Sequence, residues 1–472
     1  MTIVFGGLTS MIDFAAHARD RANQFLTLLA QWVAIPSPFD SATVQPNTPF
    51  GRGIADALSW WQQLGDDAGL NTLNVDHHAV HIEYGSGEEI VYVFGHADVV
   101  PAGEGWHFPP YQLSRLGDNL IGRGVVDDKG PMIAAWLALD ILRELKLPLQ
   151  RRIRLVAGGN EETGFRCIRR YFELQPQPTF AFTPDGKFPV IYGEKGSLLV
   201  TLTSPTVQPD LQVSCGGVVN NIPDVAHLRG LSLSCDGWTL ADGFTLLAEP
   251  GQVDHWQLYG RGGHSSKPEV CLNPIAATAQ LLHQQFNSRW TQQLYEITET
   301  TSGQSGVRFA LDTPGECGQI LLVPTVLIIE NGMMSLTLNV RYPENLTAEY
   351  IAEQLTNWNS NWPASRIAIE PVKPPSLYPP DSALVRTLHE IFTRHTGDKS
   401  HPSRTTGAGS YASAMQNAVI FGCEFPDGSS GNTHGADEYG SLSRFISAIA
   451  IYAEALYRLA NLPADSSEKR GN

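Results

Sequence analysis

The sequence predicts an α/β protein with a mostly parallel central sheet, helices on both faces of that sheet, and an inserted α+β domain. Three observations carry this prediction: apolar strand-like runs alternate with amphipathic helices early in the chain, strands dominate its middle, and strand–helix alternation returns near its end. Repeated strand–helix order is typical of a parallel sheet covered by helices. A chain of 472 residues is also too long for one ordinary hydrophobic core, so we expect more than one domain.

The first domain is predicted to comprise residues 1–193 and 374–472. In its first part, apolar spacing predicts helices 11–33 and 52–65, strands 71–75, 78–84 and 90–95, helix 129–146, strand 152–157 and helix 163–174. Helix 129–146 is apolar on nearly all sides, so we expect it to be buried against the sheet. In the second part, the pattern predicts helix 382–395, strand 418–422 and helix 441–461.

Residues 194–373 form the predicted insertion, which is long enough for two subdomains. Two helices are predicted there, near 272–287 and 347–358, among strands. The segment from Met334 to Arg341 alternates apolar and polar residues, so we expect a half-buried strand. A proline-rich stretch from Pro371 to Pro380 is expected to lead the chain back to the first domain.

Composition and charge exclude several classes of protein. Apolar residues make up 42% and charged residues 17% of the chain, as in ordinary globular proteins, and no apolar run is long enough for a transmembrane helix. The net charge of −16 leaves no basic surplus for nucleic acid or an anionic membrane. The cysteines are scattered without a CxxC pair, and residues 1–7 lack signal-peptide features. We therefore predict a cytoplasmic protein with neither a nucleic-acid nor a membrane partner.

Histidine and acidic residues follow several of the predicted strands. In parallel sheets, ligands gather at the carboxyl ends of the strands. A carboxylate has two oxygens, so Asp127 could bind one metal ion with each and hold two ions about 3.5–4 Å apart. Asp98, two positions after His96, is placed to accept the other ring N–H of a metal-bound imidazole. The full set of candidates is His96, Asp98, Asp127, Glu161, Glu162, Asp185 and His434.

Each of these motifs alone also has an ordinary structural explanation. Aspartates such as Asp127 and Asp128 are favoured at helix N-caps, and adjacent acids such as Glu161 and Glu162 suit the first turn of a helix. A turn aspartate and a single loop histidine are common and carry no chemistry by themselves. The combination, in this order and at strand ends, is far more specific than any one part.

With its neighbours, this set of residues resembles the M20 family of metallopeptidases and deacylases. The resemblance spans nearly the whole chain, and the segments from Phe182 to Asp185 and from Tyr192 to Gly196 look most like the bacterial PepV-type dipeptidase branch. It implies a zinc-peptidase-like catalytic domain with an inserted lid domain. The other motifs that carry it are Ile35-Pro36-Ser37, Gly95 to Pro101, Gly122 to Pro131 and Glu161-Glu162-Thr163-Gly164.

The resemblance implies two zinc ions per chain, for which cobalt or manganese could substitute. Mixed imidazole and carboxylate ligands suit these metals. A general base would take a proton from the bridging water and pass it to the leaving amine. The implied roles are Asp127 as the bridge, Glu162 and His434 completing one ion, His96 and Asp185 completing the other, Glu161 as the base and Asp98 as support for His96.

The insertion carries candidate substrate contacts of its own. A histidine ahead of helix 272–287 resembles the family's lid histidine, which would donate a hydrogen bond to the tetrahedral oxyanion. An arginine fork and glycine backbone N–H groups suit the terminal carboxylate of a substrate. A solvent-facing histidine and a surface salt bridge are the alternatives. The candidates are His264, Asn220 (favoured over Asn221) and Arg341 in the insertion, with Gly407 and Gly409 after it.

The predicted function is hydrolysis of dipeptides at a dinuclear zinc site. A functional monomer is expected, because the long insertion resembles the branch in which one chain contains both lid halves. The nearest rival is an N-acyl amino-acid deacylase, such as a desuccinylase, with the same metal site. The rival from another class is a catalytically inactive binding protein on the same scaffold. A serine hydrolase and a mononuclear zincin are disfavoured, because GxSxG and HExxH motifs are absent from the sequence.

Overall fold

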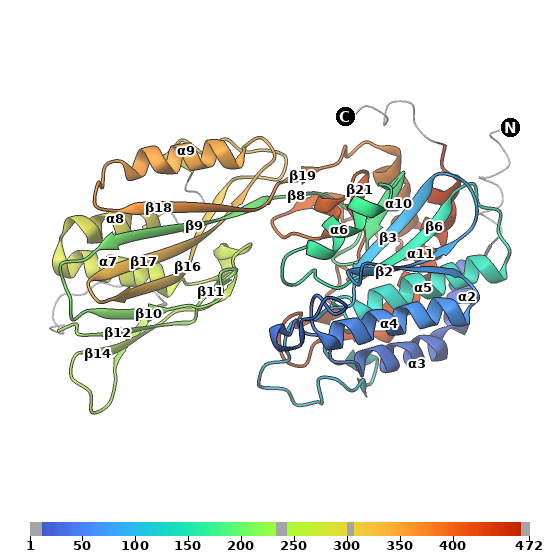
Figure 1. Ribbon diagram of the computed structural model, residues 1–472, viewed down its shortest axis with the longest axis horizontal. Helices are drawn as coiled ribbons and strands as arrows, with labels where there is room; N and C mark the ends of the chain where they lie inside the picture. Colours follow the sequence, from blue (N-terminus) through green and yellow to red (C-terminus); the bar gives the residue numbers. More distant parts are fainter. Residues whose placement is uncertain (1–11, 233–242, 300–305, 464–472) are drawn as a thin grey trace. The chain divides into compact units, whose positions relative to one another are not determined.

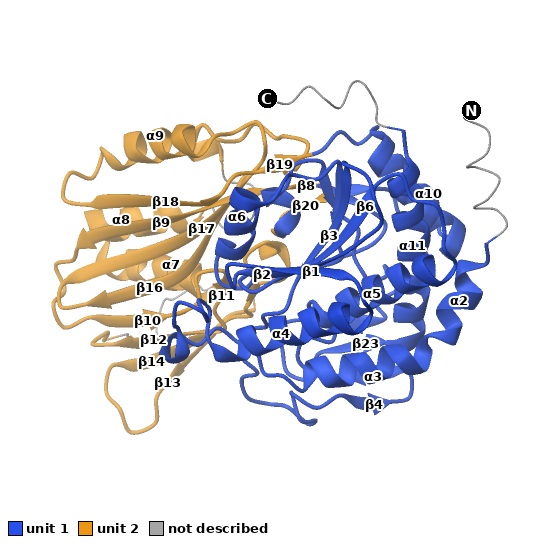
Figure 2. Ribbon diagram, turned by 45° about the vertical axis from the view of Figure 1, so that its right-hand side comes forward, with its two compact units in different colours: residues 1–192, 378–404, 410–472 blue, residues 193–377, 405–409 orange. Residues whose placement is uncertain are grey.

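The computed structural model describes residues 12–232, 243–299 and 306–463 (Figure 1). The chain divides into two compact units (Figure 2): unit 1 comprises residues 1–192, 378–404 and 410–472, and unit 2 comprises residues 193–377 and 405–409. The predicted cytoplasmic location rests in part on residues 1–7 and on Cys235. These residues lie outside the described part of the chain. Within the described part of the chain, no helix is long and apolar enough to cross a membrane.

Unit 1 is built on a sheet whose strands follow the order β1-β2-β6-β3-β7-β21-β8. These are β1 (Asn71–Val75), β2 (Ala79–Tyr84), β3 (Ile90–His96), β6 (Arg152–Gly158), β7 (Phe180–Thr183), β8 (Ile191–Glu194) and β21 (Ala418–Ile420). The four central strands pair in parallel, whereas the pairings on both flanks are antiparallel. The predicted α/β class is confirmed, with the parallel pairing confined to the centre of the sheet.

Helices cover both faces of this sheet. They are α2 (Phe14–Asp20), α3 (Ala22–Val33), α4 (Arg52–Asp67), α5 (Lys129–Glu144), α6 (Arg166–Leu174), α10 (Ala383–Thr396) and α11 (Leu442–Asn461). Along β3, Phe94 packs against Tyr171 of α6, with ring centroids 5.3 Å apart, whereas the next residue, Gly95, faces Met132 of α5. Successive residues of a strand point to opposite faces, so α5 and α6 lie on opposite sides of β3. All residues of α5 as far as Leu142 are buried, as its apolar pattern predicts.

The prediction of one helix over residues 11–33 is wrong, because α2 and α3 are separate helices that meet at Arg21. The Arg21 N–H donates to Ala18 O at 3.0 Å, which tightens the chain into a turn at that point.

Smaller elements complete unit 1. A second sheet has the order β22-β23-β5-β4, from β22 (Ser430–Gly431), β23 (Tyr439–Ser441), β5 (Asn119–Ile121) and β4 (Ser114–Leu116), and the 3₁₀ helices are η1 (Ser41–Thr43) and η5 (Tyr411–Ala414).

Unit 2 is built on an antiparallel eight-stranded sheet with the order β13-β14-β12-β10-β16-β17-β9-β18. The strands are β9 (Gly196–Pro205), β10 (Gln212–Cys215), β12 (Val225–Arg229), β13 (Thr245–Ala248), β14 (His255–Tyr259), β16 (Leu321–Glu330), β17 (Met333–Tyr342) and β18 (Arg366–Lys373). Short pieces are β11 (Asn221–Ile222), β15 (Gly263–His264), β19 (Ser376–Leu377), β20 (Arg404–Thr406), η2 (Pro268–Val270) and η4 (Val307–Phe309).

The helices of unit 2 are α7 (Pro274–Phe286), α8 (Arg289–Thr298) and α9 (Ala348–Asn359). The sequence prediction missed α8, although its buried residues Trp290, Leu294 and Ile297 have helical spacing. Along β17, Leu336 and Leu338 join these helices in one apolar cluster. The predicted alternation holds as far as Leu338, whereas the rest of the strand, to Tyr342, is buried throughout. Where two subdomains are predicted, the described residues share one eight-stranded sheet and one apolar cluster.

Candidate metal centre

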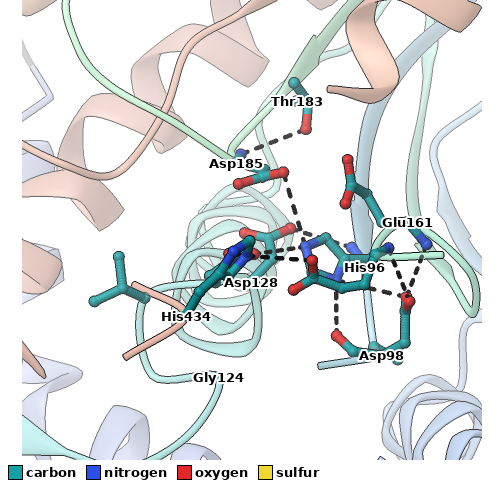
Figure 3. Close-up of polar contacts among 12 residues, drawn as sticks. His96, Asp98, Gly124, Asp128, Glu161, Thr183, Asp185 and His434 are labelled. Atoms are coloured by element: carbon teal, nitrogen blue, oxygen red, sulfur yellow. Dashed lines mark hydrogen bonds and ion pairs between the residues drawn. The ribbon is translucent and has the colours of Figure 1, made fainter. Parts of the chain in front are cut away.

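Five segments of unit 1 bring the predicted metal-binding side chains together. Because β3, β6 and β7 are parallel neighbours, their carboxyl ends meet at one edge of the sheet. Three of the segments follow these strand ends, the fourth precedes α5, and the fifth lies between β22 and β23. In that order they carry His96, Glu161 with Glu162, Asp185, Asp127 and His434. Figure 3 labels His96, Glu161, Asp185 and His434 among them.

The carboxylate of Asp127 lies between two imidazoles. Its Oδ1 is 2.8 Å from His96 Nε2, and its Oδ2 is 3.0 Å from His434 Nε2. Asp185 Oδ2 lies 3.8 Å from the same His96 nitrogen, and Glu162 Oε2 lies 3.2 Å from the same His434 nitrogen. Each oxygen of Asp127 therefore faces its own pair of partners. This arrangement suits the predicted division into two metal positions.

Burial and mutual repulsion shift the pKa values of these acids. Burial, followed by the Asp127 charge, raises the pKa of Asp185 to about 8 and also raises that of Glu162. Burial would raise the pKa of Asp127 too, but hydrogen bonds with His434 and His96 lower it below the usual value. Burial opposes the charged form of His434, yet Asp127 and Glu162 raise its pKa to about 11. The buried acids thus disfavour one another's charged forms, and positive partners would relieve that repulsion.

The side chains fit a pair of divalent cations. Glu162 Oε1 is buried without a hydrogen-bond partner among the described residues. Ligand atoms of His96, Asp127 and Glu162 lie within 4.8 Å of one another, and so do those of His96, Glu161 and Asp185. Imidazole and carboxylate donors suit zinc, cobalt or manganese. Glu161, predicted as a base and not a ligand, therefore lies directly beside the metal-binding groups.

Asp98 makes different contacts from those predicted. Its backbone carbonyl, 2.8 Å from His96 Nδ1, is the acceptor for the imidazole, whereas its carboxylate oxygen is 3.6 Å away. That carboxylate instead accepts the backbone N–H groups of Glu161 at 3.0 Å and of Glu162 at 3.1 Å. One side chain thus orients the predicted base and a predicted ligand at once, and the sequence pattern suggested only its link to His96.

Asp128 precedes α5 but its side chain does not cap that helix. Its Oδ2 accepts the backbone N–H of His96 at 3.1 Å, and the residue is fully buried. Gly95 makes this contact possible, because a Cβ there would lie 2.1 Å from Asp128 Oδ2. The capping role suggested by the sequence is therefore wrong for the side chain, which holds the end of β3. The peptide bond between Asp127 and Asp128 is cis.

The early motif at residues 35–37 supports the same region. Ser37 Oγ donates to Ala97 O at 2.7 Å, and the Val99 N–H donates to Ser37 O at 3.1 Å. Lys129, fully buried at the start of α5, donates to Ile35 O at 2.8 Å. The segment between α3 and η1 is thus tied to both the end of β3 and the start of α5.

Sequence reasoning missed a buried ion pair next to the centre. Arg123 Nη1 lies 2.8 Å from Glu438 Oε2, and both side chains are inaccessible to solvent. Arg123 lies in the motif from Gly122 to Pro131, whereas Glu438 follows the candidate His434, and the two are 315 positions apart. An arginine within a glycine-rich apolar segment was the available signal, because burial of an arginine requires a partner.

The predicted substrate-binding residues lie in unit 2, where one hydrogen-bonded network contains two of them, Arg341 and Gly407. Arg341 Nε donates to Asn339 Oδ1 at 2.8 Å, and its Nη1 donates to Gly407 O at 3.2 Å. Asn339 in turn donates to Val219 O at 3.1 Å, next to Asn220. Gly407 thus contributes its carbonyl, where the sequence suggested its N–H. Asn339 was not predicted.

His264 belongs to the same part of unit 2. β11 pairs with β15, which places Asn221 opposite His264, and the Ser265 N–H donates to Asn220 O at 2.9 Å. The Ser266 N–H donates to His264 Nδ1 at 3.2 Å. Because Nδ1 accepts, the proton of the neutral ring resides on Nε2. Gly409 lies against Lys373, whose Nζ would be 2.2 Å from a Cβ at that position.

Comparison with known proteins gives consistent similarities. The sequence model of peptidase family M20/M25/M40 matches residues 92–458. A Bacillus subtilis protein named "Putative dipeptidase YtjP" is 31% identical over 451 residues, covering 91% of this chain and 96% of that protein.

Solved structures show the same fold. Human carnosine dipeptidase 1 aligns with a TM-score of 0.56 at 15% identity, covering 95% of this chain and 99% of the other. Bacillus subtilis YXEP, described as a dinuclear metal-binding peptidase, aligns with a TM-score of 0.53 at 10% identity, covering 94% and 100%.

Replacing Asp98 with asparagine tests its positioning role. The amide has one acceptor oxygen, so one of the two N–H groups at Glu161 and Glu162 loses its partner. We expect the affinity for metal to fall about 10–100-fold, the range for residues that orient metal ligands. Competition with a chromophoric chelator measures it. Asp398→Asn is the matched control, because Asp398 Oδ1 accepts the backbone N–H groups of Ser400 and His401. Equal affinities in Asp98→Asn and wild type would contradict the assignment.

Proposed function

Because the chain belongs to peptidase family M20/M25/M40 and is a metal-dependent peptidase, we propose that it is a dinuclear zinc dipeptidase of the PepV-like branch. The observation that carries the proposal is the position of the Asp127 carboxylate, with one oxygen beside His96 and the other beside His434. A carboxylate in that position can serve two cations. The dipeptidase names of relatives support the choice of substrate.

In this proposal the side chains of unit 1 hold the ions. Such a pair of cations supplies Lewis-acid polarisation of the scissile carbonyl and a lowered water pKa. Zinc is favoured by the mixed donors, with cobalt or manganese as substitutes. His96 and Asp185 would bind one ion, Glu162 and His434 the other, and Asp127 both.

Glu161 is the proposed general base. It takes a proton from the attacking water and delivers it to the leaving amine. Burial, followed by the nearby Asp185, raises the pKa of its carboxyl well above the usual value. A raised pKa suits a group that must accept a proton and hold it until the leaving group departs. Asp98 fixes the backbone on which this carboxyl is carried.

The residues of unit 2 are proposed to bind the substrate. His264, with its proton on Nε2, donates to the oxyanion, while Asn220 contributes a further polar contact. Burial lowers the pKa of Arg341 to about 10, so it keeps its charge at neutral pH and can bind a terminal carboxylate. Gly407 and Gly409 belong to the loop beside it. Contacts at both ends of a substrate restrict its length, which favours dipeptides.

Glu161→Gln tests the mechanism. The amide cannot accept the water proton, so we expect activity to fall by about 10²–10⁴-fold while metal content stays the same. Asp127→Ala is the counterpart, because it removes the shared carboxylate and should lose both ions. Steady-state kinetics and elemental analysis give the two readouts. Full activity in Glu161→Gln, or unchanged metal content in Asp127→Ala, would contradict the proposal.

A substrate panel tests the reaction class. We expect hydrolysis of dipeptides with a free amine and a free carboxylate, because the proposed contacts recognise both ends. N-acetyl and N-succinyl amino acids form the second half of the panel, assayed with the same zinc-loaded protein. Cleavage of the acylated compounds alone would replace the dipeptidase with a deacylase.

We also propose a cytoplasmic location and a functional monomer. The segments that carry Asn220 and His264 pair within one chain, through β11 and β15, which supports the monomer. The prediction is a single species by size-exclusion chromatography with light scattering, and a specific activity that stays constant on dilution. A dimer that loses activity on dilution would exclude the monomer.

A further inference from the structure

The buried pair of Arg123 and Glu438 connects two loops that carry metal-binding candidates. Arg123 lies four residues before Asp127, and Glu438 lies four residues after His434. The exposed fraction of the Arg123 side chain is 1%, and that of Glu438 is also 1%. Their ion pair measures 2.8 Å. The hydrogen bonds of both side chains go to each other and to backbone groups, and none goes to a side chain of the candidate metal centre.

Glu438 organises the backbone before Asp127. Its Oε2 accepts the Gly124 N–H at 3.0 Å as well as the Arg123 guanidinium. Its Oε1 accepts the Val126 N–H at 2.8 Å and the Asp127 N–H at 3.2 Å. One carboxylate therefore receives three backbone N–H groups and one side-chain N–H. This short segment belongs to no helix or strand, so these bonds define its path.

Arg123 organises the loop that carries His434. Its Nη2 donates to Gly435 O at 3.0 Å and to His434 O at 3.3 Å. The same nitrogen lies 3.4 Å from the carbonyls of Pro101 and Ala102, in the segment after β3. The planar guanidinium can make several such bonds at once, whereas a lysine ammonium would reach fewer of them.

Burial of two charges is costly unless their geometry is good and their other hydrogen-bonding positions are filled. The ion pair is short, and most of its other hydrogen-bonding positions are filled by groups of the two loops and of the segment after β3, whereas Arg123 Nε has no hydrogen-bond partner among the described residues. The other half of the centre has separate supports. His96 ends β3 and is held by the Asp98 carbonyl and the Asp128 carboxylate.

We propose that the Arg123–Glu438 pair is a positioning device that sets Asp127 relative to His434, and that it thereby controls the affinity of the one metal position formed by Asp127, Glu162 and His434. The inference rests on the proposed dinuclear function. It predicts unequal effects, because the position formed with His96 and Asp185 keeps its own supports.

Glu438→Gln is the principal test, made in the full chain with zinc as the probe. Its amide offers one acceptor oxygen where the carboxylate offers two, so some of the four donors lose their acceptor. We expect the zinc-binding step that His434→Ala identifies as the His434 position to lose about 10–100-fold in affinity. The other step also uses Asp127 but keeps the separate supports of His96, so it should lose distinctly less. Calorimetric titration and chelator competition measure both.

The matched control is Glu454→Gln. Glu454 is another glutamate of unit 1 with a 3% exposed residue surface, and it pairs with Arg394 and with His395, the latter at 2.7 Å. This variant should lower the melting temperature yet leave both zinc affinities unchanged. If Glu438 contributes to stability alone, Glu438→Gln will also lower the melting temperature and leave both zinc affinities unchanged. That outcome would overturn the inference. An equal loss at both zinc-binding steps would overturn it as well.

Arg123→Lys provides a second variant if Glu438→Gln fails to fold. It keeps the positive charge but loses contacts to the His434 loop, so the same selective loss is expected, and an equal loss at both steps overturns the inference. The proposed function stands if the wild type binds two zinc ions and Asp127→Ala binds none. In that case, unchanged zinc affinities in Glu438→Gln overturn only the inference about Arg123 and Glu438. Fewer than two ions in the wild type overturn both.

Discussion

The candidate metal centre of unit 1 depends on the contact of one carboxylate with two imidazoles. Asp127 has an oxygen 2.8 Å from His96 and another 3.0 Å from His434, and further acids lie around it. Buried carboxylates repel one another, so their positions must be enforced by the surrounding backbone. The protein does this with other acids: Asp98, Asp128 and Glu438 point their oxygens at backbone N–H groups. Acidic residues thus serve two purposes here, as candidate ligands and as acceptors that hold the ligand-bearing loops.

The sequence predicted the parts of this site that depend on position along a strand. His96, Glu161 and Asp185 follow apolar runs, and parallel neighbours necessarily present their carboxyl ends at one edge. The α/β class and most helix bounds followed from apolar spacing for the same reason. Whether these residues bind metal stays a prediction.

The sequence could not predict which donor each carboxylate meets. Asp98 was assigned to an imidazole and Asp128 to a helix cap, and both instead accept backbone N–H groups from residues distant in the sequence. The pairing of Arg123 with Glu438 has the same character, because no local pattern connects loops 315 positions apart. The break at Arg21 was missed because apolar spacing continues across it. In unit 2, Asn339 was overlooked because an asparagine in an alternating strand has no distinctive pattern.

Gly95 has a consequence for how this protein can change. Its hydrogen is the only side chain that the end of β3 accommodates, because a methyl group would lie 2.1 Å from Asp128 and 2.5 Å from the sulfur of Met132. The spacing between β3 and α5 is therefore set by steric exclusion at a residue that binds nothing. Candidate ligands such as His96 could be exchanged during evolution while the frame that carries them stayed the same. Exchange of Gly95 would displace that frame, whichever metal or substrate the protein used.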